Sequence, residues 1–224
     1  MINYDLKILA LSGLVFLVYF LVSWKSKKLG IGNLESALSV ENGLEQINIK
    51  HSIGIVSFGM IFLIFSPEFD VHLTGIREFN LVEIIVVVLL ISLAIIISIR
   101  SARSTEIHKA KIDIPTIQRI RYYFIVRTIF LFSYELFFRG ILFFLLIDFV
   151  GVIWAILIVT GSYILIHIFD SKVEIIGSLP FGIILCLISY FTHSIWGPFA
   201  IHLGLSMAFE LTRFSLINQK IVKS

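Results

Sequence analysis

Residues 81–99 read LVEIIVVVLLISLAIIISI, a run in which Glu83 is the one charged side chain. A helix needs about 20 predominantly apolar residues to cross the hydrocarbon core of a bilayer. A run of this length and composition is typical of a transmembrane helix. The sequence therefore indicates an integral membrane protein.

The composition of the whole chain supports the same conclusion. Its 224 residues are 58% hydrophobic and include 21 Phe, and the mean hydropathy is +1.00, whereas soluble domains are about 45–50% apolar. One water-soluble core cannot hide so much apolar surface, so the lipid bilayer must solvate part of it. The net charge of +3 is small, and basic residues that flank apolar runs do not suggest a nucleic-acid surface. The single cysteine, Cys186, is expected to be a buried, inert thiol.

We therefore predict an all-α fold, a polytopic transmembrane bundle of about seven spans (six to eight). The first apolar run precedes the basic cluster Lys25, Lys27 and Lys28, whereas a secretion signal has its basic residues before the run, so this run is interpreted as a true span. The expected spans are Ile8–Trp24, Ile53–Ser66, Leu81–Ile99, Tyr122–Val150, Val152–Phe169, Ile175–Phe191 and Ile195–Leu211.

The basic residues near the span ends predict the orientation. The lysines after the first span place its connector in the cytoplasm. Connector Pro67–Asn80, with Arg77 as its only Lys or Arg, is expected outside, and connector Ser101–Arg121, with five Lys or Arg, inside. The isoleucines of this second connector recur at near-helical spacing, so it is expected to be partly amphipathic and to lie on the anionic leaflet. The N-terminus is then outside and the C-terminus cytoplasmic, in what is expected to be a bacterial cell membrane.

Two segments are distinguished along the chain. Residues 1–121 hold the first three spans and the basic cytoplasmic connector. Residues 122–224 hold the membrane core in which ionisable side chains are concentrated. This division separates the apolar anchors from the part that carries candidate chemistry.

Charged residues in the middle of a span are costly, by roughly 2.5–3.5 kcal/mol each on insertion scales. Glu135 and Arg139 lie four residues apart in the fourth span, so they share a helix face and can pair. His167 lies near the inner end of the fifth span. His202 begins a polar stripe with Ser206 and Glu210 on the seventh. A structural ion pair and satisfied histidines would also explain these residues, but together they favour one polar cavity in the membrane.

The residues Tyr134–Gly140, YELFFRG, resemble the Glu-Glu-x-x-x-Arg motif of the CAAX prenyl protease and bacteriocin-processing (CPBP, or Abi) family of intramembrane endopeptidases. Tyr163 to His167 resembles the family's second motif, Phe-x-x-x-His, and His202 to Ser206 resembles its third, His-x-x-x-Asn. The resemblance covers roughly Arg121–Leu211. It implies peptide-bond hydrolysis within the membrane, with Glu135, His167 and His202 as catalytic residues and Tyr134, Arg139, Tyr163 and Ser206 in support, and without a metal or another cofactor.

The motifs depart from the family pattern at three positions. Tyr134 replaces the first glutamate, which the family uses to activate water, and a phenol is a poor base at neutral pH because its ordinary pKa is about 10. Ser206 replaces the asparagine that helps to stabilise the oxyanion, and removing such a donor costs roughly 10²–10³ in rate. Tyr163 replaces a phenylalanine, which is a mild change.

These departures leave two main interpretations open. The first is an intramembrane endopeptidase that cuts a peptide or membrane-protein substrate near the cytoplasmic surface. The second is a catalytically degenerate relative that acts as a membrane scaffold or as a bacteriocin-immunity or regulatory protein. Metal or haem binding by His167 and His202 ranks below both, as does transport, because no paired broken helices are evident. The sequence does not identify the substrate.

Overall fold

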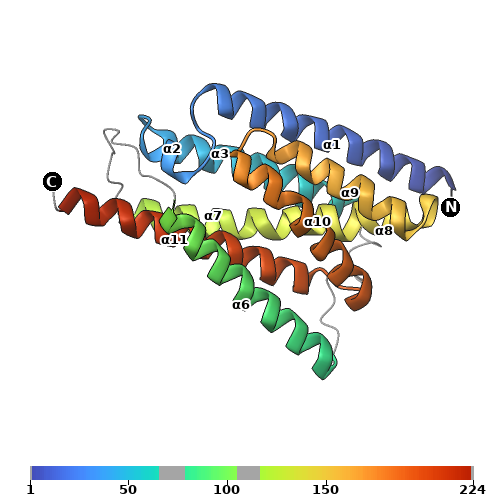
Figure 1. Cartoon of the computed structure of the whole chain (residues 1–224). Coiled ribbons are helices and arrows are strands. Elements are labelled where there is room, and N and C mark those ends of the chain that lie inside the picture. Colours follow the sequence, from blue (N-terminus) through green and yellow to red (C-terminus); the bar gives the residue numbers. More distant parts are fainter. Residues whose placement is uncertain (1, 66–78, 105–116, 223–224) are drawn as a thin grey trace.

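A computed structural model describes residues 2–65, 79–104 and 117–222, and these residues form helices joined by short turns. The two termini lie at opposite ends of an elongated helical bundle (Figure 1). The helices are α1 (Ile2–Lys28), α2 (Leu34–Leu38), α3 (Gly43–Ile55), η1 (Val56–Met60), α4 (Ile61–Phe65), α6 (Leu81–Ser104), α7 (Ile117–Glu135), η2 (Leu136–Leu142), α8 (Phe143–Val150), α9 (Val152–His167), α10 (Lys172–Thr192) and α11 (Trp196–Val222). The predicted all-α bundle is confirmed.

In their described residues, all seven expected spans lie on helix apart from one or two residues at their ends. The fourth is one continuous rod built from α7, the π-helical segment η2 and α8, as expected for Tyr122–Val150. The second begins about ten residues earlier than expected, at Gly43, because polar side chains such as Asn48 and His51 turn into the bundle and do not end the helix. The predictions about connector Pro67–Asn80 and most of Ser101–Arg121 fall outside the described residues.

Within the part of the chain that the structure describes, five helical stretches are long and apolar enough to cross a membrane: Tyr4–Lys28, Gly43–Phe65, Leu81–Ser104, Gln118–Val150 and Lys172–Thr192. Helix α9 is apolar but shorter. Helix α11 has the length, but its polar stripe lowers its hydropathy. The protein is an integral membrane protein, and the orientation of its termini stays a prediction.

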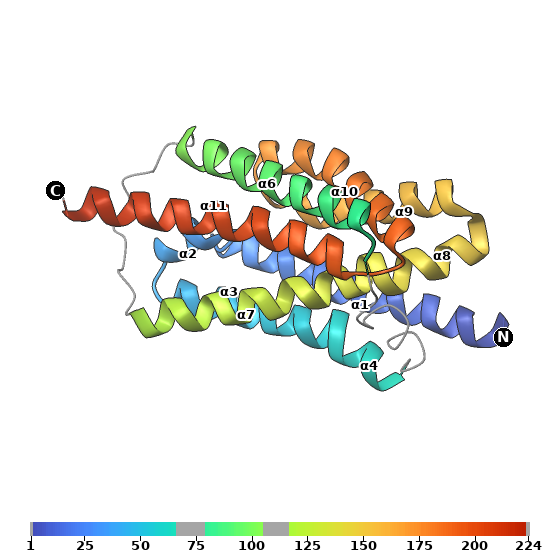
Figure 2. The same ribbon diagram turned by 90° about the horizontal axis from the view of Figure 1, so that it is seen from below.

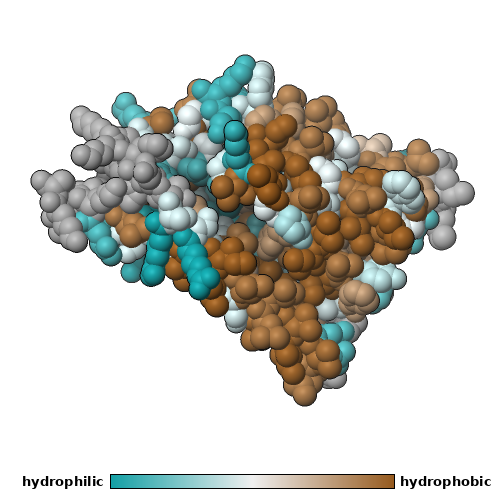
Figure 3. All heavy atoms as spheres, viewed as in Figure 1, coloured by the Kyte–Doolittle hydropathy of each residue, from teal (hydrophilic) through white to brown (hydrophobic). Residues whose placement is uncertain are grey.

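The outer surface carries the large apolar side chains that a bilayer would solvate. On the face shown in Figure 3, hydrophobic residues cover α6 and its neighbours. Hydrophilic residues gather mainly toward the end of the molecule that carries α2. On α6, the small residues Ala94, Ser98 and Ala102 are buried, whereas most of its large ones are exposed. Small residues allow close helix contact in membranes, and α6 accordingly lies along α11 (Figure 2).

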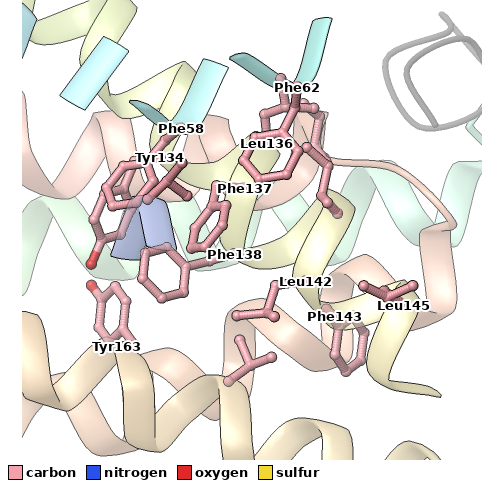
Figure 4. Packing of buried hydrophobic residues seen from close by; sticks show 14 of the residues in the cluster. Phe58, Phe62, Tyr134, Leu136, Phe137, Phe138, Leu142, Phe143, Leu145 and Tyr163 are labelled. Carbon is pink, nitrogen blue, oxygen red and sulfur yellow. The ribbon is translucent and has the colours of Figure 1, made fainter. Parts of the chain in front are cut away.

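The centre of the bundle is aromatic. Phe58 of η1 stacks on Phe137 of η2, with ring centroids 4.5 Å apart, and Tyr134 of α7 lies 4.5 Å from the Phe138 ring (Figure 4). This cluster also contains Ile8, Val15 and Tyr19 of α1. The N-terminal helices and the C-terminal core therefore share one packed interior, although the division at residue 121 itself stays a prediction.

Candidate functional site

The first motif lies where the fourth rod changes from α-helix to π-helix. Helix α7 ends at Glu135, and η2 runs from Leu136 to Leu142. A π-helical segment adds a residue to the turn and often occurs at functional sites, because it changes the directions in which neighbouring side chains point. Every residue of η2 is buried, Arg139 included. The motif is thus carried on an irregular, fully enclosed part of the rod.

Glu135 and Arg139 form a buried ion pair, as the sequence predicts. Their closest atoms, Arg139 Nη1 and Glu135 Oε2, are 3.3 Å apart, and both side chains are 0% exposed. His202 of α11 adds a third member, since its Nδ1 lies 2.5 Å from Glu135 Oε1. A hydrogen bond to an ionised carboxylate is shorter and stronger than one between two neutral groups. The first and third motifs are therefore joined directly, through the Glu135 carboxyl group.

The two motif tyrosines lie beside this group. The ring of Tyr163 sits 4.4 Å from the Arg139 guanidinium carbon, in a cation–π contact. The Tyr134 ring lies 5.8 Å from that of Tyr163 and 5.9 Å from that of His202. The two phenol oxygens point toward one another (Figure 4). Although Tyr134 and Glu135 leave the helix in different directions, both reach the same cluster.

His167 joins the cluster at its edge. Its ring centroid lies 4.6 Å from that of Tyr163, which in turn lies 6.3 Å from that of His202. The Nδ1 atom of His167 contacts Asp170 Oδ2 at 2.8 Å. This nitrogen is therefore bonded to Asp170 and not to Glu135. The side chain is 23% exposed. Of the three histidine and glutamate residues predicted to be catalytic, His167 is thus the one that reaches the surface.

Several buried polar atoms in the cluster have no hydrogen-bond partner among the described residues. They are Tyr134 Oη and His167 Nε2; Glu135 Oε2 makes no hydrogen bond either, but it lies 3.3 Å from Arg139 Nη1 in the ion pair. A buried polar atom left in this state costs about 1–3 kcal/mol. Two such atoms in one cluster of ionisable side chains lower the stability of the folded protein. They are available to hydrogen-bond a bound molecule.

Ser206 takes part in a different network. Its hydroxyl accepts a hydrogen bond from Arg127 Nη2 at 3.0 Å and donates one to Glu210 Oε1 at 3.3 Å. Arg127 Nε also lies 3.0 Å from Glu210 Oε1, and Tyr123 donates to the other Glu210 oxygen. The expected polar stripe of α11 is therefore turned inward, but only its first member, His202, reaches Glu135. The Tyr134 ring, by contrast, lies 5.9 Å from the His202 ring, on the side of the Glu135 cluster.

No function was predicted for His51 and Asp170 from the residues alone. His51 contacts Arg127 Nη1 at 3.2 Å from α3, but it stands in a stretch with the composition of a polar connector. Asp170 follows His167 by three residues. This spacing allows the two side chains to meet, and it was the one feature of the sequence that could have indicated their contact. Among the described residues, no group of three or more His, Cys, Asp or Glu side chains is placed to hold a metal ion.

Residues 115–208 match one protein-family model, described as type II CAAX prenyl endopeptidase Rce1-like. The matched segment ends two residues after Ser206, so it contains all three motifs. The resemblance to this family of intramembrane endopeptidases is confirmed over that segment. No curated protein and no solved structure matches the chain.

Proposed function

We propose that this relative of the type II CAAX prenyl endopeptidases hydrolyses a peptide bond in a membrane-associated substrate. The observation that supports the proposal is the cluster of Glu135, His202, Tyr134 and His167, with unpartnered polar atoms, beside the buried Arg139. The substrate is a peptide or membrane protein that reaches the cluster from the cytoplasmic side. The protein acts in a bacterial cell membrane, with its N-terminus outside.

Amide hydrolysis needs a base that activates water and donors that stabilise the oxyanion. Glu135 and His202, which share a contact of 2.5 Å, form an acid–base pair, and His167 adds a second imidazole within the cluster. Arg139 places a positive charge 3.3 Å from the Glu135 carboxyl group. The Tyr134 hydroxyl takes the part of the oxyanion donor, because it is unpartnered and stays protonated at neutral pH.

One observation favours a second candidate, a non-catalytic scaffold. Tyr134 stands where the family has its first glutamate, and Glu135 is held by both Arg139 and His202 with 0% of its side chain exposed. A carboxylate held by two partners in this way can have a purely structural role, as the counter-charge of a buried arginine. On this alternative the protein binds a membrane protein or peptide and cleaves nothing, as an immunity or regulatory protein would.

The deciding experiment co-expresses tagged candidate substrates with the wild type or a variant. The candidates are a membrane protein with a prenylated C-terminus and a bacteriocin precursor with its leader. The first variant is Tyr134→Phe, which removes a hydroxyl without a partner and leaves the ring packing intact. The second is His202→Ala. The matched control is Tyr190→Phe, the same change at a partly exposed position outside the motifs.

If the proposal is correct, the wild type and Tyr190→Phe cleave one candidate. Tyr134→Phe then loses about 10²–10³ in rate, as expected for an oxyanion donor, and His202→Ala loses more. All variants should reach wild-type levels in the membrane. Equal cleavage by the wild type and both motif variants would refute this mechanism. Binding of a candidate without any cleavage would favour the scaffold.

A further inference from the structure

The geometry points to Asp170 as a positioning residue that fixes the His167 ring so that its Nε2 atom is the general base of the reaction. This inference rests on the proposed peptidase function and deepens it. It selects His167, and not Glu135, as the group that removes the proton from water. It also brings into the site a residue that lies outside all three motifs.

The chain between α9 and α10 holds Asp170 in place. Helix α9 ends at His167, and the Asp170 amide donates to the His167 carbonyl at 2.9 Å, which closes a tight turn. The next residue, Ser171, caps α10 by accepting a hydrogen bond from the Glu174 amide. Because the turn is fixed on both sides, the Asp170 carboxyl group can reach back to the ring three residues earlier.

The contact of 2.8 Å between His167 Nδ1 and Asp170 Oδ2 determines which ring nitrogen carries the proton. An ionised carboxylate only accepts hydrogen bonds, so Nδ1 must donate. In the neutral imidazole, Nε2 then holds the lone pair. That atom is enclosed and has no partner among the described residues. The ring is thus prepared to accept a proton at Nε2.

Glu135 is less suited to this task. Its charge is shared between Arg139 and His202, with the closest atoms at 3.3 and 2.5 Å. Because Oε1 contacts His202 and Oε2 lies against Arg139, neither oxygen of this carboxyl group is left free to take a proton from water. His202 uses its Nδ1 on the same carboxyl group. His167, by contrast, has a carboxylate on one nitrogen and an unpartnered second nitrogen.

The proposed step balances without a further reactant. His167 Nε2 takes a proton from water as the water oxygen forms a bond to the carbonyl carbon of the substrate, and the carbonyl π electrons move onto its oxygen. When the tetrahedral intermediate collapses, the C–N bond breaks. The proton on Nε2 then passes to the leaving amine. Asp170 stays ionised throughout and stabilises the imidazolium that forms in between.

The test combines an atom-level measurement with kinetics. Nitrogen-15 NMR of histidine-labelled protein in lipid nanodiscs reports which ring nitrogen of His167 is protonated, and the spectrum of His167→Gln assigns its signals among the six histidines. The variant is Asp170→Asn, whose amide can turn a donor toward the ring and favour the other tautomer. The matched control is Asp148→Asn, at an exposed position at the far end of the rod.

We expect the wild type and Asp148→Asn to carry the proton on Nδ1, and Asp170→Asn to shift it to Nε2. With a cleaved substrate, Asp170→Asn should lower kcat about 10²-fold, within the range for general base catalysis, and leave KM within about twofold. A proton on Nε2 in the wild type, or a kcat for Asp170→Asn equal to that of Asp148→Asn, would overturn the inference. Absence of cleavage by the wild type would refute the proposed function instead, and the tautomer would still show whether Asp170 orients the ring.

Discussion

Replacing Glu135 by glutamine should destabilise the protein strongly, whether or not it is an enzyme. The change leaves the Arg139 guanidinium, which is 0% exposed, without its counter-charge. Removing one partner of a buried ion pair costs about 3–5 kcal/mol, because the other charge stays in a medium of low dielectric constant. The neutral amide also weakens the charge-assisted contact to His202. We therefore expect a loss of about 3–5 kcal/mol.

A double-mutant cycle isolates this effect. The free energy of unfolding is measured in mixed micelles of lipid and sodium dodecyl sulfate for the wild type, Glu135→Gln, Arg139→Met and the double variant. Because the double variant buries no lone charge, it should be more stable than Glu135→Gln alone. The control is Glu45→Gln, which breaks the exposed pair with Arg119 at 3.2 Å and should cost at most about 1 kcal/mol.

Two results would refute this reasoning. One is a loss for Glu135→Gln as small as that of the Glu45→Gln control. The other is a double variant whose loss equals the sum of the two single losses, since independent sites are additive and coupled sites are not. Either result would mean that Arg139 finds compensation elsewhere in the bundle.

Two further predictions concern packing and topology. A Cβ on Gly54 would lie 2.4 Å from a Phe130 ring carbon, whereas one on Gly13 meets nothing within 4 Å. Gly54→Ala should therefore destabilise the protein by about 1–3 kcal/mol, and Gly13→Ala should not destabilise it. Equal unfolding midpoints for the two variants would contradict the close helix contact at Gly54. Single cysteines introduced into the connector Ser101–Arg121, which is predicted to be cytoplasmic, should not react with a membrane-impermeant thiol reagent added to intact cells. They should react once the membrane is opened. Labelling in intact cells would mean that the orientation is the reverse of the predicted one.

The class of fold and the motif residues could be predicted from the sequence because the bilayer imposes strong local rules. An apolar run such as Leu81–Ile99 must be helical in lipid, since its backbone groups have no water to bond. The cost of burying a charge likewise draws attention to Glu135 and Arg139 without any coordinates. The pairing of those two residues followed from their spacing along one helix.

Contacts between helices depended on the tertiary structure. The spacing of four between His202 and Ser206 places both on one face of α11, but it does not say which neighbour each will meet. The packing of α11 sets His202 against Glu135 and Ser206 against Arg127. The beginning of the second span was misjudged for a related reason, because His51 is polar yet buried through its contact with Arg127.

A helical membrane protein with motifs that resemble those of one family, in the same order, could be predicted without coordinates, because helix formation and the cost of burying a charge depend on residues close together in the chain. Which polar atoms are paired and which are free could be learned from the packing of the helices, and not from the spacing of residues along the chain. In the folded protein, His202 contacts Glu135, Asp170 contacts His167 and Ser206 contacts Arg127. A hydrogen bond needs two atoms within about 3 Å of each other. Those distances are set by the crossing of helices that lie far apart in the chain, which no local rule predicts.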